Sequence, residues 1–194
     1  MLKIIHRVNT IKFLRKIPHN FGVEIDLRAY GKDIILTHEP FHTGDVFEEY
    51  LKNYQHAFII LNIKEAGIED KVLALLKKYK IKNYFLLDVE FPYIYRAARQ
   101  GVRNIAIRYS EDEPIEMALK YKQYVDWIWI DTNTRLPLNK SIIKKLAGFK
   151  TCLVSPERWG RPQDIFNYQK KMKELNFVPD AVMTEISYVF QWEE

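Results

Sequence analysis

Two acidic residues one position apart, Glu24 and Asp26, lie within an apolar run near the N-terminus. If this run is a β-strand, their side chains point the same way, because residues two apart share a face of the strand. Two such carboxylates repel each other, and a buried pair must take up a proton or find a cation. Mg²⁺ and Ca²⁺ favour carboxylate and carbonyl oxygens, so a divalent cation would relieve the repulsion. Arg7, Arg28 and Lys64 are the alternative counter-charges.

Two histidines flank this acidic pair in the sequence. His6 ends the first apolar run and is followed by Arg7, while His38 follows a short run beyond the pair. Imidazole titrates near neutral pH, which suits it to donate or accept protons in catalysis. We therefore predict that His6 and His38 are functional. The remaining histidines lie in loop-like contexts and are expected to be solvated: His19, His42 and His56.

Other apolar runs also end in polar residues. Asn62 and Lys64 share one face at the end of a third run, and Lys64 is a further candidate functional residue. Trp127 and Trp129 are interpreted as packing residues. Charged residues at the ends of the later runs either line a functional site or form ion pairs around its rim: Asp88, Arg108, Asp131 and Glu185.

The runs that carry these residues are rich in Ile, Val, Leu and aromatic side chains. Most lack polar alternation, which is typical of parallel strands buried on both faces. Eight such strands are predicted: Lys3–His6, Gly22–Arg28, Ala57–Lys64, Tyr84–Val89, Asn104–Tyr109, Trp127–Asp131, Thr151–Ser155 and Ala181–Glu185. A short extra strand over Asp33–Thr37 follows a turn at residues 30–32.

Segments with apolar residues at helical spacing separate the strands. The predicted helices are Asp45–Tyr54, Ile68–Lys80, Pro92–Arg99, Pro114–Tyr121, Asn139–Leu146 and Arg161–Leu175. Eight strands alternating with helices predict a trimmed (β/α)8 TIM barrel that spans residues 1–194 as a single domain, with about 24 residues per repeat. An open doubly wound sheet is the alternative, but the G-x-G-x-x-G phosphate-binding motif is absent.

Composition limits the class of protein. The 194 residues are 47% hydrophobic and 28% charged, as expected of one globular domain, which excludes a disordered or collagen-like chain. The single cysteine excludes an internal disulfide and suits a reducing compartment, so we expect a cytoplasmic protein. No run is long enough to span a membrane. The net charge of +5 comes without a nucleic-acid motif, and no nucleic-acid partner is expected.

The residues described above resemble the glycerophosphodiester phosphodiesterase family, whose members belong with the phosphatidylinositol-specific phospholipase C-like barrels. Four pieces of sequence carry the resemblance, in this order: Ile4-Ile5-His6-Arg7, Val23-Glu24-Ile25-Asp26, Leu36-Thr37-His38-Glu39-Pro40 and Asn62-Ile63-Lys64. They cover about the first third of the chain. The rest agrees with the family in its strand–helix rhythm.

The resemblance implies a metal-dependent phosphodiesterase that acts on a small anionic phosphodiester. His6 and His38 would be the general acid and base, and Glu24 and Asp26 would hold Mg²⁺ or Ca²⁺. Arg7 and Lys64 would contact the phosphate oxygens. Outside the segments that carry the resemblance, Arg108 is a further candidate for phosphate binding.

Two positions depart from the family pattern. Val8 stands where the family usually has glycine, so the loop after Arg7 must run differently. Asn62 stands where the family has a third metal carboxylate; its amide oxygen can still ligate Mg²⁺ or Ca²⁺, but one negative charge is lost. We therefore expect lower metal affinity, or a contribution from Asp88 or Glu185.

Two other functions stay open from the sequence. A non-catalytic barrel that binds a phosphorylated ligand or a partner is consistent with Asn62. A phosphosugar isomerase or aldolase would use Lys64 as a Schiff-base residue. The last strand is followed by few residues, so a second subunit covering it, as in a homodimer, is also expected.

Overall fold

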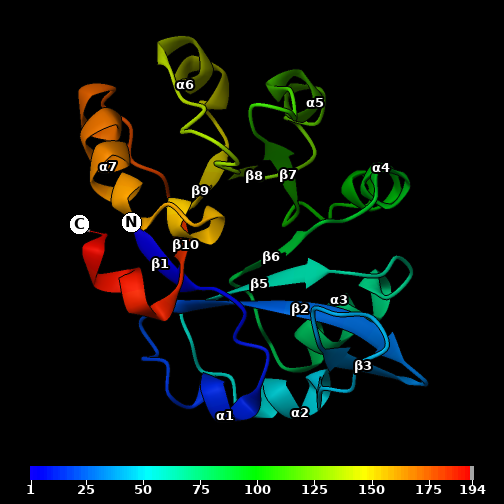
Figure 1. Cartoon of the computed structure of the whole chain (residues 1–194). Helices are drawn as coiled ribbons and strands as arrows, with labels where there is room; N and C mark the ends of the chain where they lie inside the picture. The colour runs from blue at the N-terminus through cyan, green and yellow to red at the C-terminus, as the bar shows by residue number, and fades with distance from the viewer. Residues whose placement is uncertain (193–194) are drawn as a thin grey trace. The chain divides into compact units, whose positions relative to one another are not determined.

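Strands alternate with helices along the chain in the computed structural model, which describes residues 1–192 (Figure 1). The chain folds as two units, each with its own packed interior. The N-terminal unit is Ile4–Tyr95, and the C-terminal unit combines Met1–Lys3 with Arg96–Glu194.

The strands of the N-terminal unit surround one long strand, β2. The elements of this unit, including two that continue across its limits, are β1 (Leu2–Ile5), α1 (Ile11–Leu14), β2 (Gly22–Tyr30), β3 (Asp33–Leu36), β4 (Asp45–Val46), α2 (Phe47–Lys52), β5 (Phe58–Ile63), α3 (Glu69–Lys78), β6 (Tyr84–Leu87) and α4 (Phe91–Arg99). The long β2 ribbon and the short hairpin folded against its far end are visible in Figure 1.

Strand β2 shares one of its edges between two partners. Its beginning pairs in parallel with β1, Ile4 lying opposite Gly22. Its end pairs antiparallel with β3, Leu27 lying opposite Leu36. The other edge of β2 pairs in parallel with β5, which in turn pairs with β6. Because β1 and β3 approach along one edge from opposite directions, the segments that follow them meet at the middle of β2.

The β3–β4 hairpin closes tightly. Leu36 pairs with Asp45, so the loop between them is held at both ends. Gly44 lies against the backbone of Leu36, and a Cβ atom there would fall well inside contact distance of the Leu36 carbonyl oxygen. A residue without a side chain is therefore needed at Gly44 for the loop that carries His38 to close.

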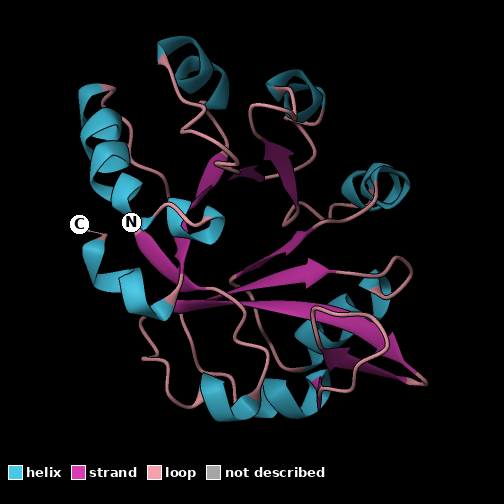
Figure 2. Ribbon diagram, viewed as in Figure 1, coloured by secondary structure: helices cyan, strands magenta, loops and turns pink. Residues whose placement is uncertain are grey.

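The C-terminal unit repeats a strand followed by a helical segment (Figure 2). Its strands pair in parallel in the order β7, β8, β9, β10, and the Leu2 N–H donates to the Asp180 carbonyl. The elements are β7 (Ala106–Tyr109), α5 (Ile115–Lys120), β8 (Trp127–Ile130), α6 (Lys140–Leu146), β9 (Lys150–Val154), the 3₁₀ helices η1 (Pro156–Trp159) and η2 (Pro162–Asp164), α7 (Ile165–Glu174), β10 (Ala181–Thr184) and η3 (Ile186–Gln191).

All eight predicted strands are present within one or two residues of their expected bounds. The predicted start of the helix at Asp45 was wrong, because Asp45 and Val46 pair with β3 and the helix begins at Phe47. The α/β class is confirmed, whereas closure into a barrel and a single domain stay predictions. None of the helices in the described part of the chain combines the length and the apolar character needed to cross a membrane.

We expect Gly44→Ala to destabilise the protein by about 1–3 kcal/mol, the usual cost of overpacking, since the added methyl group displaces the Leu36 carbonyl. Thr43→Ala, at the exposed neighbouring position, is the control and should change stability little. Chemical denaturation measures both variants. Equal stability of Gly44→Ala and the wild type would contradict the steric role of Gly44.

Candidate functional site

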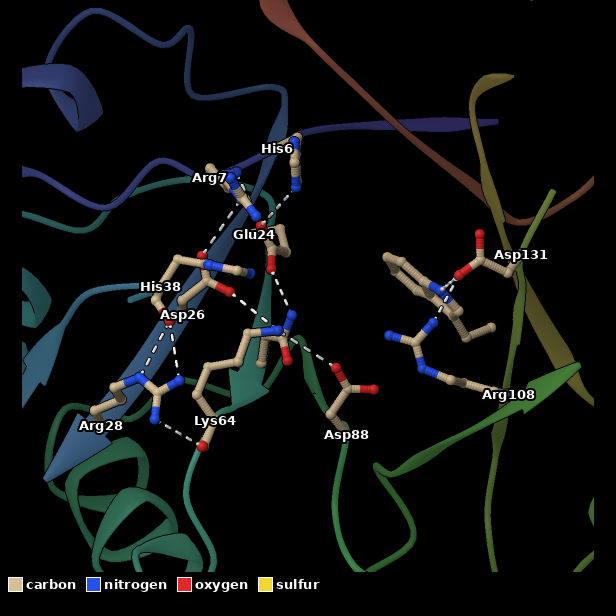
Figure 3. A network of polar contacts seen from close by, with 12 residues as sticks. His6, Arg7, Glu24, Asp26, Arg28, His38, Lys64, Asp88, Arg108 and Asp131 are labelled. Carbon is tan, nitrogen blue, oxygen red and sulfur yellow. Dashed lines mark hydrogen bonds and ion pairs between the residues drawn. The ribbon is translucent and has the colours of Figure 1, made fainter. Parts of the chain in front are cut away.

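The Glu24 and Asp26 carboxylates lie at the centre of a polar cluster within the N-terminal unit (Figure 3). Both are side chains of β2, and each residue is 1% exposed. The alternation of β2 places them on one face, as the sequence predicts. Two acidic groups are thus buried side by side, which is costly unless each carboxylate is paired or protonated.

Glu24 accepts two hydrogen bonds from groups on neighbouring strands or loops. The backbone N–H of Arg7 donates to Oε2 at 2.8 Å, and the Asn62 amide donates to Oε1 at 3.1 Å. His6 Nε2 lies 3.9 Å from Oε2. Burial, reinforced by the charge of Asp26, raises the pKa of Glu24 to about 7, against the lowering effect of both hydrogen bonds and of Lys64.

Asp26 is held by an asparagine that the sequence did not single out. The Asn9 amide donates to Oδ2 of Asp26 at 2.8 Å, and Asn9 Oδ1 accepts from the Asp26 backbone N–H at 2.8 Å. Two cations are near the same carboxylate: Lys64 Nζ is 3.5 Å from Oδ1, and Arg7 Nε is 3.9 Å from Oδ2. The side-chain charges around Asp26 therefore oppose its own.

Lys64 bridges two carboxylates. Its ammonium group is 3.5 Å from Asp26 and 3.5 Å from Asp88. Asp88 follows β6 in a left-handed backbone conformation with φ of 58°, unusual for a residue with a side chain. The Asp88 carboxylate thus pairs with Lys64.

His38 is positioned through both its ring and its backbone. The ring Nδ1 lies 2.6 Å from Oε1 of Glu39, and this contact lowers the pKa of Glu39. Arg28 donates two hydrogen bonds to the His38 carbonyl and one to the Lys64 carbonyl. Arg28, one of the three alternative counter-charges, directs its guanidinium hydrogen bonds to these two backbone carbonyls.

Backbone hydrogen bonds explain why the two histidine-bearing segments meet. After β1 the Val8 N–H donates to the Glu24 carbonyl, and after β3 the Thr37 N–H donates to the Asp26 carbonyl. Both segments thus continue along the same edge of β2. Arg7 has a φ of 53°, a turn that directs its N–H toward the Glu24 carboxylate. Figure 3 shows His6 and His38 arranged around the acidic pair together with Arg7 and Lys64.

The cluster offers oxygen atoms to a cation. Within residues 1–192, no three His, Cys, Asp or Glu side chains are grouped so as to hold a metal ion. Two buried oxygens nevertheless accept no hydrogen bond, Oδ1 of Asp26 and Oδ1 of Asn62. Carboxylate and amide oxygens are the donors that Mg²⁺ and Ca²⁺ take, so the donor set of Glu24, Asp26 and Asn62 fits such an ion.

The other predicted residues lie in the C-terminal unit. Arg108 forms a 2.6 Å ion pair with Asp131, which is buried. Glu185 exposes its side chain, and its backbone N–H donates to Glu157. In the N-terminal unit, the expectation of a solvated His56 was wrong: it is buried, with Nε2 2.9 Å from the Ile17 carbonyl oxygen.

Three solved structures share this fold. A protein from Agrobacterium tumefaciens assigned as a glycerophosphoryl diester phosphodiesterase aligns over 98% of this chain and 96% of its own, with a TM-score of 0.71 and 12% identity. A glycerophosphoryl diester phosphodiesterase from Parabacteroides distasonis aligns over 98% and 85%, with a TM-score of 0.67 and 10% identity. A glycerophosphodiester phosphodiesterase from Agrobacterium tumefaciens aligns over 95% and 97%, with a TM-score of 0.63 and 12% identity.

No protein-family model matches the chain, and no curated protein matches it in sequence. The structural likeness, at 10–12% identity, establishes the fold. The predicted resemblance to glycerophosphodiester phosphodiesterases is thus confirmed at the level of the fold.

We expect Glu24→Gln to stabilise the metal-free protein at pH 8 by roughly 3 kcal/mol, from a folded-state pKa of about 7 against an ordinary value of 4.5. Because the folded pKa is raised, the unfolded chain releases its proton first as the pH rises, and wild-type stability falls between about pH 4.5 and pH 7. The gain should be nearly absent at pH 4, where Glu24 is protonated in both states. Denaturation in EDTA at both pH values measures it, and a gain of equal size at pH 4 would contradict the raised pKa.

Proposed function

We propose that this protein is a metal-dependent phosphodiester hydrolase of the glycerophosphodiester phosphodiesterase type, acting on a small anionic phosphodiester. The observation that carries the proposal is the convergence of two histidine-bearing segments on one buried acidic pair. The shared fold supports the reaction class. A histidine on each segment would supply one acid–base group for each side of the phosphorus atom in an in-line displacement.

In this proposal His6 and His38 divide the proton transfers. One imidazole takes a proton from the attacking water molecule, and the other donates a proton to the leaving alkoxide. The contact of His38 Nδ1 with Glu39 would fix the ring and leave Nε2 for the substrate. Arg28, through the His38 carbonyl, would position this residue without touching the substrate.

Cationic side chains would bind the phosphate group. Lys64 is 17% exposed and Arg7 37% exposed, so each can reach a ligand while paired with Asp26. Both would stabilise the charge that develops on the phosphate oxygens. Glu24, Asp26 and Asn62 would hold Mg²⁺ or Ca²⁺, and such an ion supplies Lewis-acid stabilisation of a phosphoryl oxygen.

A Schiff-base role for Lys64 receives less support. Its ammonium group is 3.5 Å from both Asp26 and Asp88. Both ion pairs hold the amine nitrogen against carboxylates, whereas a Schiff base requires this nitrogen to attack a carbonyl group. An isomerase or aldolase mechanism would have to overcome this pairing.

A non-catalytic protein that binds a phosphorylated ligand is the second candidate function. The contacts of Lys64 and Arg7 with Asp26 favour it, because these cations offset part of the acidic charge without a metal ion. Asn62 adds no charge of its own. The two candidates differ in whether the wild-type protein binds a divalent cation.

We expect hydrolysis of bis(p-nitrophenyl) phosphate to require added Mg²⁺ or Ca²⁺. His6→Ala and His38→Ala should each lower kcat by at least about 100-fold with the fold intact, the usual contribution of a general acid or base. His42→Ala, on the exposed part of the same loop as His38, is the matched control and should retain activity. A fully active His38→Ala variant would contradict the two-histidine assignment.

We expect Asn62→Asp to raise the affinity for Mg²⁺ or Ca²⁺ about tenfold in calorimetry, because it restores a carboxylate beside an Asp26 oxygen that accepts no hydrogen bond. Measurable metal binding by the wild type supports the hydrolase. Binding by Asn62→Asp together with none by the wild type favours the non-catalytic candidate. No binding by either protein would contradict a cation site at these residues.

A further inference from the structure

The loop that follows β9 in the C-terminal unit is fixed at both ends and in its middle. Glu157 is buried and accepts hydrogen bonds from the hydroxyls of Ser155 and Thr184 and from the Glu185 backbone N–H. Gly160 takes the left-handed conformation, with φ of 73°, and its N–H donates to the Glu157 carbonyl at 2.9 Å. These bonds hold the η1 turn in one shape without any ligand.

The far end of the loop is anchored by Arg161. Its guanidinium group donates to the Thr132 carbonyl and pairs with Asp164 at 2.7 Å. The loop is therefore a rigid support, the kind of element on which binding residues are held before a ligand arrives.

Trp159 lies on this rigid loop, and its ring is partly exposed to solvent. It is 44% exposed, and its indole N–H donates to Oδ1 of Asp131 at 2.9 Å. Asp131 is buried and also accepts from Arg108, the Trp129 indole and the Thr132 backbone N–H. The indole N–H is already bonded to Asp131, and Asp131 accepts three other hydrogen bonds. Trp159 can therefore offer a ligand only the apolar surface of its ring.

The Arg158 guanidinium group lies over this ring, and among residues 1–192 it has no acidic partner. Its guanidinium carbon is 5.6 Å from the centre of the Trp159 ring, and it forms no ion pair with a carboxylate in the described part of the chain. Arg158 is half-buried, between an anchored Glu157 and an anchored Trp159. A cation held in this way favours an anion that can accept two of its N–H groups, as phosphate does.

We propose that Arg158 and Trp159 form a binding site for a phosphorylated sugar. The phosphate group pairs with Arg158, and the C–H face of the sugar ring packs on the indole of Trp159. No second exposed aromatic side chain lies in the η1 turn to sandwich a flat base, so one indole face suits a sugar ring better. The site consists of residues of the C-terminal unit alone and does not rest on the proposed hydrolase function.

Glucose 1-phosphate is the probe, titrated in EDTA while tryptophan fluorescence and its quenching by iodide are followed. Trp159 is the most exposed tryptophan of the chain, since Trp127, Trp129 and Trp192 are buried, so it dominates iodide quenching. We expect saturable binding with protection from iodide. Inorganic phosphate should bind at least about tenfold more weakly, because it lacks the ring.

Arg158→Gln and Trp159→Leu should each weaken binding of glucose 1-phosphate by about tenfold or more. Arg135→Gln removes an exposed arginine of the same unit and should bind like the wild type. Trp159→Leu is followed by calorimetry because it lacks the reporter ring, and circular dichroism checks its fold. Arg158→Gln leaves the hydrogen bonds of Glu157, Trp159 and Arg161 in place, so it still tests the binding site if Trp159→Leu does not fold.

Absence of saturable binding by the wild type up to about 10 mM would overturn the proposal. Wild-type affinity in Arg158→Gln would overturn it as well, and equal affinity for inorganic phosphate would overturn the role of the ring. The measurement involves neither metal nor hydrolysis, so an inactive hydrolase that binds the sugar phosphate, or the reverse, separates this site from the proposed function.

Discussion

The repulsion between two buried carboxylates on one strand governs the organisation of the N-terminal unit. Glu24 and Asp26 are each 1% exposed, and neither has a full counter-charge in direct hydrogen-bond contact. The contacts around them act as partial compensation: a backbone N–H and an amide on Glu24, an asparagine and two more distant cations on Asp26. The raised pKa of Glu24 shows that this compensation is incomplete.

The shared edge of β2 is what allows so many groups to reach this pair. A strand paired with one long neighbour on each side would have both edges occupied by regular ladder bonds at Glu24 and Asp26. Here β1 stops before the pair and β3 stops after it, so irregular segments supply the bonds between them. Irregular backbone can carry the turn at Arg7 and the hairpin loop at His38, which regular strands cannot.

Patterns of residue type predicted the strands and the central residues of the cluster. Apolar runs located all eight parallel strands, and the two-residue period placed Glu24 and Asp26 together. What the sequence could not supply was the direction of long or flexible groups. Arg28 shares the face of the acidic pair but is long enough to reach the backbone carbonyls of His38 and Lys64.

The positions of two further residues could not be predicted from the sequence either. Asn9 looks like an ordinary loop residue, because its contact with Asp26 depends on the backbone reversal at Arg7, for which the sequence offers no glycine. Asp45 begins a segment whose apolar residues have helical spacing, yet Asp45 and Val46 pair with β3 as a short strand. Tertiary pairing across a loop outweighs a local pattern that is only a few residues long.

Two other buried carboxylates accept more hydrogen bonds than Glu24 and Asp26 do. Burial of an acidic side chain in this protein therefore does not by itself leave its oxygens without donors. Asp131 accepts four hydrogen bonds, and Glu157 accepts three, so each of these buried carboxylates is satisfied by fixed donors. Asp26 and Asn62 instead keep oxygen atoms without hydrogen-bond donors. A buried acceptor without a donor is costly, and Oε2 of Glu111 is a further carboxylate oxygen that accepts no hydrogen bond. Oδ1 of Asp26 lies 3.5 Å from Lys64 Nζ, so Lys64 and the proposed cation would compete for this oxygen, while Asp131 and Glu157 hold the side chains that donate to them.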